Sequence, residues 1–302
     1  MLHRGNASLA RAGWSTQSAW ITAPSYGGTS ELAHSTLQSG VWVDSRQRYA
    51  ELIGTSRFTL SDAFNKAGWR TVSDSPRDEP SFPVGKSFYH FDQLLSRYNV
   101  GYHGPTFGYA SMPDQYALAE FQRLELAPGH RPVMAELDLV SSHWPWTPLP
   151  AMVPWNQVGD GSIFDPMPAK GQSAITVGRS ADAVRQAYGR SIQYTMKALT
   201  SWVTELNDPN LVLILLGDEQ PGSPITSPGR ASHEVPISII ARDPSVFRQS
   251  ASWHWQNGLL PAPSAPLEPM DAFRNQLLNT FSSKNPAGDA SAQGSAQPGQ
   301  PR

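Results

Sequence analysis

Short apolar runs alternate with amphipathic stretches along most of the chain. Continuous runs of large and β-branched apolar residues predict strands that are covered on both faces of a sheet. The longest amphipathic stretch, residues 180–206, repeats apolar side chains every three or four positions, which predicts a long helix. We expect strands at residues 18–23, 70–73, 133–140, 211–216 and 235–241.

Two shorter helices have recognisable end signals. A helix over residues 60–67 is followed by Gly68, which suits a left-handed C-terminal cap. Ser111 can cap a second helix with Pro113 in its first turn. Because strands follow helices in this order, we expect an α/β domain with a mainly parallel sheet, whose ligands bind beyond the carboxyl ends of the strands.

Composition limits the number of domains. The chain has 302 residues, of which 39% are hydrophobic, so it can bury one substantial core. We expect one domain over residues 1–282 and a disordered tail over 283–302, where Asn, Pro, Ala, Gly, Ser and Gln dominate. No apolar run approaches the roughly 20 residues that span a bilayer, and the first residues lack the apolar core of a secretory signal.

Charge and cysteine content exclude several kinds of partner and chemistry. The net charge is -2 and the basic residues are scattered, so nucleic acid is not an expected partner. The absence of cysteine excludes disulfides and thiolate nucleophiles, and leaves oxygen and imidazole as ligands for any metal.

A glycine-rich turn lies between the first expected strand and a helical stretch. It reads Gly27-Gly28-Thr29-Ser30 and places two hydroxyls at a helix N-terminus. Free N–H groups there favour a bound anion and lower the cost of an alkoxide, so Thr29 and Ser30 are candidate nucleophiles. Spacing alone does not separate this role from that of an ordinary N-cap, which is the commoner role of Ser and Thr at such a position.

Two adjacent carboxylates follow the apolar run 211–216. Asp218 and Glu219 repel each other unless a cation lies between them, so they are candidate ligands of a hard divalent ion. A solvated turn is the alternative.

Two histidines lie near other strand ends. His143 follows the run 133–140 and is a candidate ligand of a substrate oxygen. His233 precedes the run 235–241 and could reach Asp218 if the two strands are neighbours, although a lone histidine is more often structural. We assign His34 to packing.

Together these segments resemble the sulfatase-like branch of the alkaline-phosphatase superfamily, especially lipoteichoic-acid-synthase-like bacterial proteins, over about residues 10–281. The resemblance implies a three-layer sandwich, with Thr29 or Ser30 as nucleophile and Thr29 also as metal ligand. Gly217-Asp218-Glu219 is similar to the family's Gly-Asp-His metal motif, with Glu219 in place of the histidine. His143 matches a substrate-contacting histidine, and His233 resembles a later histidine that binds metal in some branches.

The resemblance implies a metal-dependent hydrolase or transferase of small-molecule or lipid-linked phosphate or sulfate esters. The divalent ion would be Mn, Zn, Mg or Ca, and the second carboxylate moves the preference away from zinc. The implied location is the extracytoplasmic side of a bacterial membrane, in the cell envelope. A serine hydrolase is disfavoured because no G-x-S-x-G turn occurs.

The sequence departs from the family at its start. The family also takes an early acidic ligand from its first strand, whereas residues 1–30 contain no carboxylate. Either the chain is part of a longer protein whose other part carries membrane helices and that strand, or it is an inactive homologue that serves as a binding or scaffold domain.

Overall fold

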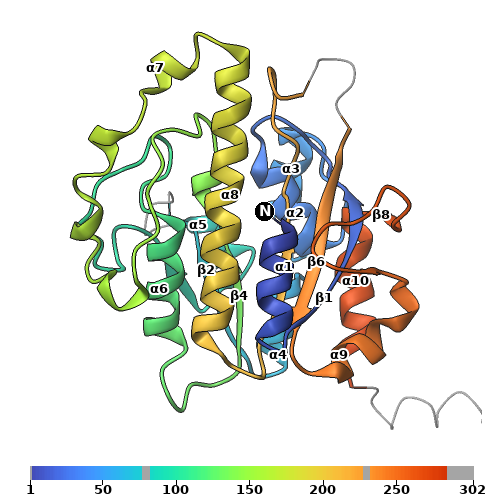
Figure 1. Ribbon diagram of the computed structural model, residues 1–302. Coiled ribbons are helices and arrows are strands. Elements are labelled where there is room, and N and C mark those ends of the chain that lie inside the picture. Colours follow the sequence, from blue (N-terminus) through green and yellow to red (C-terminus); the bar gives the residue numbers. More distant parts are fainter. Residues whose placement is uncertain (1, 77–81, 227–231, 284–302) are drawn as a thin grey trace, which may run out of the picture.

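The computed structural model of the protein describes residues 2–76, 82–226 and 232–283. The expected tail lies almost wholly outside the described residues. Within them, helices pack against β-strands on both sides (Figure 1), which confirms the α/β class.

The strands form two sheets. The larger has the order β5-β6-β1-β7, with β8 also beside β1, and the smaller has the order β3-β2-β4. Their bounds are β1 Ser15–Thr22, β2 Arg70–Asp74, β3 Gln93–Leu95, β4 Val133–Leu137, β5 Val212–Leu216, β6 Glu234–Ala241, β7 Gln256–Asn257 and β8 Leu267–Pro269.

Strand direction differs between the sheets. In the smaller sheet β2 runs parallel to both β3 and β4. In the larger sheet β6 runs antiparallel to both β1 and β5, and only β8 lies parallel to β1. The expectation of a mainly parallel sheet is therefore wrong for the larger sheet. The structure has no helix between β5 and β6 among the described residues, and strands joined without a crossover helix pair antiparallel.

Helices cover both faces of the strands. They are α1 Leu2–Arg11, α2 Ser30–Ser39, α3 Arg46–Ile53, α4 Leu60–Lys66, α5 Pro83–Ser87, α6 Asp114–Glu125, α7 Ala174–Val177, α8 Ala181–Leu206, α9 Pro244–Gln249 and α10 Met270–Phe281. Figure 1 shows α1 beside α8 on one side of the strands, while α10 lies on the other side. The long helix expected over 180–206 is confirmed by α8, which ends where Asn207 adopts a left-handed conformation.

Two cores lie on opposite faces of the strands. One contains Leu9 of α1, Phe121 of α6 and Trp202 of α8. The other contains Ala33 of α2 and Phe273 of α10, among other residues. We refer to these as the α8 core and the α10 core.

The start of α6 differs from the expectation. The helix begins at Asp114, Pro113 is its N-cap, and no side chain caps it. The hydroxyl of Ser111 instead donates to the carbonyl oxygen of Pro76 at 2.6 Å. Ser111 is therefore not a cap, because its hydroxyl is hydrogen-bonded to a residue that is distant in sequence.

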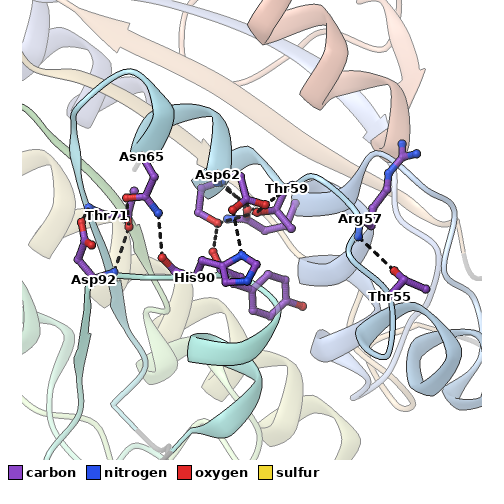
Figure 2. Close-up of polar contacts among 11 residues, drawn as sticks. Thr55, Arg57, Thr59, Asp62, Asn65, Thr71, His90 and Asp92 are labelled. Carbon is purple, nitrogen blue, oxygen red and sulfur yellow. Dashed lines mark hydrogen bonds and ion pairs between the residues drawn. The ribbon is translucent and has the colours of Figure 1, made fainter.

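The start of α4 is held by a capping box. The Thr59 hydroxyl and the Asp62 carboxylate each pair with the other residue's backbone N–H. Figure 2 shows that Asp62 also contacts Nδ1 of His90, at 2.9 Å, and that Asn65 donates to the carbonyl oxygen of His90 at 2.8 Å. Thr71 of β2 joins Asn65 to Asp92 in the same view, so this polar cluster fastens α4 to β2 and to the segment leading into β3.

A buried carboxylate joins α6 to α8 and to the segment after β4. Asp114 accepts hydrogen bonds from the Thr195 hydroxyl at 2.6 Å and from the backbone N–H of Ser141 at 2.8 Å. Burial raises the pKa of Asp114, while these hydrogen bonds oppose the shift. We expect Asp114→Ala to lower the free energy of unfolding by about 2–4 kcal/mol, because it leaves two buried donors without their acceptor.

Denaturant unfolding measures this effect. The matched control is Asp182→Ala, whose side chain on α8 is 84% exposed and should change stability by less than about 0.5 kcal/mol. Equal effects of the two substitutions would contradict the assignment of Asp114 as a structural link.

Candidate active site

Three strands end at one edge of the molecule. The turn that leads from β1 into α2 carries Thr29 and Ser30, the end of β4 carries Glu136 and Asp138, and Asp218 and Glu219 follow β5. The carboxyl end of β2 adds Asp74, whose backbone oxygen accepts from the N–H of Asp138 at 2.8 Å. The site is therefore built from segments that are distant in sequence.

The carboxylate of Glu219 lies at the N-terminus of α2. It accepts hydrogen bonds from the backbone N–H groups of Gly28 and Thr29, the latter at 3.0 Å, and from the Ser25 hydroxyl at 3.1 Å. These amides have no acceptor within α2, and amides of this kind bind anions at helix N-termini. Burial, together with the charge of Asp218, raises the pKa of Glu219, while the hydrogen bonds from Ser25, Thr29 and Gly28 lower it.

The two candidate nucleophiles point to the two candidate ligands. Thr29 is the residue before α2, but its side chain makes no capping hydrogen bond. Its hydroxyl lies 3.4 Å from Oε2 of Glu219, and the Ser30 hydroxyl donates to Oδ2 of Asp218 at 2.5 Å. The structure therefore brings together four of the residues that the sequence singled out, and the side chain of Thr29 does not act as an ordinary N-cap.

A second acidic group surrounds His34 of α2. Its Nδ1 lies 2.6 Å from Oε1 of Glu136 and 3.6 Å from Oδ1 of Asp138. One ligand atom from each of the three residues lies within 4.8 Å of the other two. Burial lowers the pKa of His34, but the negative charges of Asp138, Glu136 and Asp218 outweigh it, and the pKa is raised well above its ordinary value.

This electrostatic environment suits a cation. Imidazole nitrogen and carboxylate oxygens are ligands of transition and hard divalent ions, and the raised pKa of His34 shows that positive charge is favoured there. The charge of Asp218 also raises the pKa of His34. The acidic residues after β5 and those at the end of β4 therefore act on the same imidazole. The residues present therefore fit a divalent cation.

Asp74 adds a buried acid to this edge. Burial raises its pKa well above the ordinary value, and the charges of Asp138 and Asp114 raise it further. Its Oδ1 is buried and has no hydrogen-bond partner among the described residues. The shift favours the protonated, neutral form of Asp74, so this edge is crowded with acidic groups that cannot all carry charge.

His143 lies in an aromatic segment. Its ring stacks on Tyr109 with centroids 3.5 Å apart, and its Nδ1 lies 2.7 Å from the carbonyl oxygen of Trp144. Trp146 of the same segment packs edge-on against Tyr188 of α8 at 5.1 Å. Burial and then the charge of Asp218 raise the pKa of Tyr188, so this aromatic segment reaches the neighbourhood of the acidic site. Contact of His143 with a substrate stays a prediction.

His233 lies beside the turn that carries Thr29. The strands β5 and β6 are neighbours, as its candidate role required. Its Nδ1 lies 3.0 Å from the carbonyl oxygen of Ala23, and its ring packs edge-on against Tyr26. These contacts fix His233 against the segment that leads from β1 to Thr29. Metal ligation by His233 stays a prediction.

Four residues of the site, His34, Asp74, Glu136 and Asp138, were missed in the sequence. His34 had been assigned to packing, and residues 133–140 to one continuous strand. The strand ends at Leu137, so Glu136 and Asp138 lie at its carboxyl end. Two acidic residues within an apolar run were the available signal.

Comparisons with known proteins identify the fold. No protein-family model and no curated protein matches the sequence. Among solved structures, the lipoteichoic acid synthase LtaP from Listeria monocytogenes aligns with a TM-score of 0.55 at 13% identity, covering 93% of this chain and 67% of that one. The chain therefore has an alkaline-phosphatase-like α/β fold, since a protein of the alkaline phosphatase superfamily from Vibrio parahaemolyticus also aligns, with a TM-score of 0.50 at 16% identity over 87% of this chain.

Two transferases show the same likeness. The Streptococcus pyogenes phosphoglycerol transferase GacH, solved with sn-glycerol-1-phosphate, aligns with a TM-score of 0.56 at 15% identity, over 91% of this chain and 67% of that one. The integral membrane phosphoethanolamine transferase EptA from Neisseria meningitidis gives 0.51 at 12% identity, over 92% of this chain. The chain spans 50% of the length of EptA. None of the helices that the structure describes is long and apolar enough to cross a membrane.

The position of Glu219 generates a prediction about anion binding. In the absence of added metal, we expect Glu219→Ala to bind inorganic phosphate about tenfold more tightly than the unchanged protein, because the N–H groups of Gly28 and Thr29 become free and a negative charge is removed. Calorimetric titration measures the affinity. Glu234→Ala, an exposed acid at the start of β6, is the matched control and should leave the affinity unchanged. Weaker binding to Glu219→Ala would contradict the prediction.

Proposed function

We propose that this protein is a metal-dependent hydrolase or transferase of phosphate or sulfate esters in the bacterial cell envelope, with a hydroxyl nucleophile at the start of α2. The observation that carries the proposal is the start of α2, which brings the Thr29 hydroxyl to Glu219 after β5 and brings His34 to Glu136 and Asp138 at the end of β4. The names of the similar structures, a phosphoglycerol transferase and a phosphoethanolamine transferase, favour phosphate esters as the substrate class.

The reaction begins with attack by Thr29. Its Oγ1 forms a bond to phosphorus while the ester oxygen of the leaving group departs, which gives a covalent phospho-threonine. Glu219 Oε2, 3.4 Å from that oxygen, accepts the hydroxyl proton. Water or an acceptor alcohol then attacks phosphorus and releases Thr29, so water makes the protein a hydrolase and an alcohol makes it a transferase.

Other residues orient the reactants and carry charge. His34, Glu136 and Asp138 would hold a divalent cation, which offsets negative charge on the transferred group when it is bound. Asp218 positions the Ser30 hydroxyl and is a further candidate ligand, since its charge acts on His34. His143, with its aromatic neighbours, would contact the substrate beyond the transferred group.

A binding or scaffold domain is the second candidate function. The observation that favours it is the position of the Glu219 carboxylate. It accepts hydrogen bonds from the amides at the start of α2, which a transferred group would otherwise accept. In that case the protein would keep an anion pocket and the fold without turnover.

The metal site is tested by calorimetric titration with Mn²⁺, Zn²⁺ and Mg²⁺. We expect His34→Ala and Asp138→Asn each to weaken binding at least about tenfold, because each removes a ligand. His130→Ala, an exposed histidine at the opposite end of β4, is the control and should bind normally. Failure to bind any of the three ions at millimolar concentration would sink the metal-dependent reading.

The nucleophile is tested with aryl phosphodiester, phosphomonoester and sulfate substrates in the presence of the metal that binds. We expect Thr29→Val to lower turnover at least about 100-fold while metal affinity changes much less, because the attacking oxygen is lost and the proposed ligands around His34 are kept. Thr176→Val, an exposed threonine of α7, is the control. Metal binding with no turnover of any of the three esters would favour the binding-domain alternative.

A further inference from the structure

Two arginine side chains meet at the C-terminal end of α2. Nε of Arg57 donates to the carbonyl oxygen of Ser39 at 2.9 Å, and Nη1 of Arg274 on α10 donates to the same oxygen. Because both nitrogens bond to one atom, they lie within roughly 6 Å of each other, which is two hydrogen-bond lengths. Two permanent positive charges are therefore held close together at a fixed point of the fold.

A third cation lies beside this pair. Nζ of Lys66, at the end of α4, lies 4.7 Å from the centroid of the Phe58 ring, and Cζ of Arg274 lies 5.7 Å from the same centroid. Arg57 directly precedes Phe58 in the chain. We refer to Arg57, Lys66 and Arg274 as the basic cluster. Its members come from the segment before α4, from α4 and from α10, so only the tertiary structure brings them together.

No carboxylate pairs with the basic cluster. None of the ion pairs among the described residues includes Arg57, Lys66 or Arg274. Asp62 is a nearby acid, but the capping box of α4 and Nδ1 of His90 already engage its carboxylate. Figure 2 shows the Arg57 side chain pointing away from Asp62. The positive charge of the cluster is therefore left without a direct counter-ion in the described part of the chain.

The end of α2 does not balance this charge either. Arginine commonly bonds the last carbonyl groups of a helix, and one guanidinium is enough for that role. A helix C-terminus carries about half an elementary negative charge, whereas Arg57 and Arg274 bring two positive charges to it. Burial, and then the charge of Arg57, lowers the pKa of Arg274, while the charge of Asp62 acts in the opposite direction. The second arginine is thus held against electrostatic repulsion.

The basic cluster has a buried base and an open side. Arg274 is only 7% exposed, and its Nε makes no hydrogen bond among the described residues. Arg57 and Lys66 are exposed to solvent. An anion that arrives from solvent can therefore reach the two exposed side chains and lie above the buried guanidinium.

We propose that the basic cluster is a binding site for a doubly charged phosphoryl group, such as that of diphosphate or a phosphate monoester. Guanidinium N–H groups match phosphate oxygens in geometry, and one phosphoryl group can bridge two donors at this spacing. A dianion fits better than chloride or a single carboxylate, because it can neutralise both arginines at once. The ten residues of α2 span about 15 Å, so this site is separate from Thr29 at the other end of the helix.

Thermal unfolding with inorganic diphosphate tests the site. The buffer contains EDTA, so that no divalent ion links the ligand to the carboxylates around His34. We expect about 10 mM diphosphate to raise the Tm by at least about 3 °C, because a ligand that binds only the folded state stabilises it. Sodium chloride at the same ionic strength is the control and should raise the Tm by less than about 1 °C. Equal shifts would overturn the proposal, since screening of the repelling charges would then explain the stabilisation.

A variant tests whether the basic cluster holds the ligand. Arg57→Gln removes one guanidinium at an exposed position, where the fold tolerates the change. We expect calorimetric titration to show that this variant binds diphosphate at least about tenfold more weakly, because one of the two bridging groups is lost. Arg248→Gln, at an exposed arginine of α9 outside the cluster, is the matched control and should bind normally. Equal affinity of Arg57→Gln and the unchanged protein would overturn the proposal.

Hydrogen exchange locates the bound ligand. Diphosphate should slow the exchange of backbone amides at residues 39–42 and 56–58 at least about fivefold, since these segments hold the basic cluster. Slowing confined to residues 28–31 would overturn the proposal, because the ligand would then lie at the start of α2. None of these readouts requires metal or turnover, so a failure here would leave the proposed function standing.

Discussion

The common direction of β1, β4 and β5 is the constraint on which the site depends. Each of these strands ends at the same edge, and each is followed there by polar residues instead of continuing its apolar run. Thr29 and Glu219 are 190 residues apart in the chain but lie in hydrogen-bond contact because their strands end together. The cores on the two faces of the strands hold this edge in place, so packing far from the site determines its geometry.

Electrostatics at this edge is dominated by excess negative charge. Glu136, Asp138 and Asp218 all act on His34, and the pKa of His34 rises as a result, even though burial by itself would lower it. Glu219 finds neutral donors instead, in the amides at the start of α2. Negative charge is thus stabilised in two ways in the site. Near β4 the His34 side chain lies among carboxylates, and near β5 the start of α2 donates hydrogen bonds to Glu219. The residues around His34 fit a divalent ion, and the amides at the start of α2 are the donors that Glu219 occupies.

The strands β4 and β5 differ in burial from the strands beside them. Among the described residues, β4 pairs only with β2, and β5 pairs only with β6. Every residue of β4 and the last four residues of β5 are half-buried. The acidic residues of the site are therefore carried by strands that are less buried than β2 and β6.

Local sequence pattern determined the positions of the main strands and of α8, because side-chain periodicity and helix-end signals act within a few residues. It also singled out Gly27-Gly28-Thr29-Ser30 and Asp218-Glu219, since polar residues that interrupt apolar runs are visible without a structure. Only the tertiary structure decided the direction of β6, the start of α6 and the partners of His34. The direction of a strand depends on which strand edges pair. The Ser111 hydroxyl donates to a carbonyl oxygen that is distant in sequence. Glu136, which contacts His34, lies 102 residues away along the chain. Such long-range pairing is set by the packed arrangement of whole elements, which no local pattern encodes.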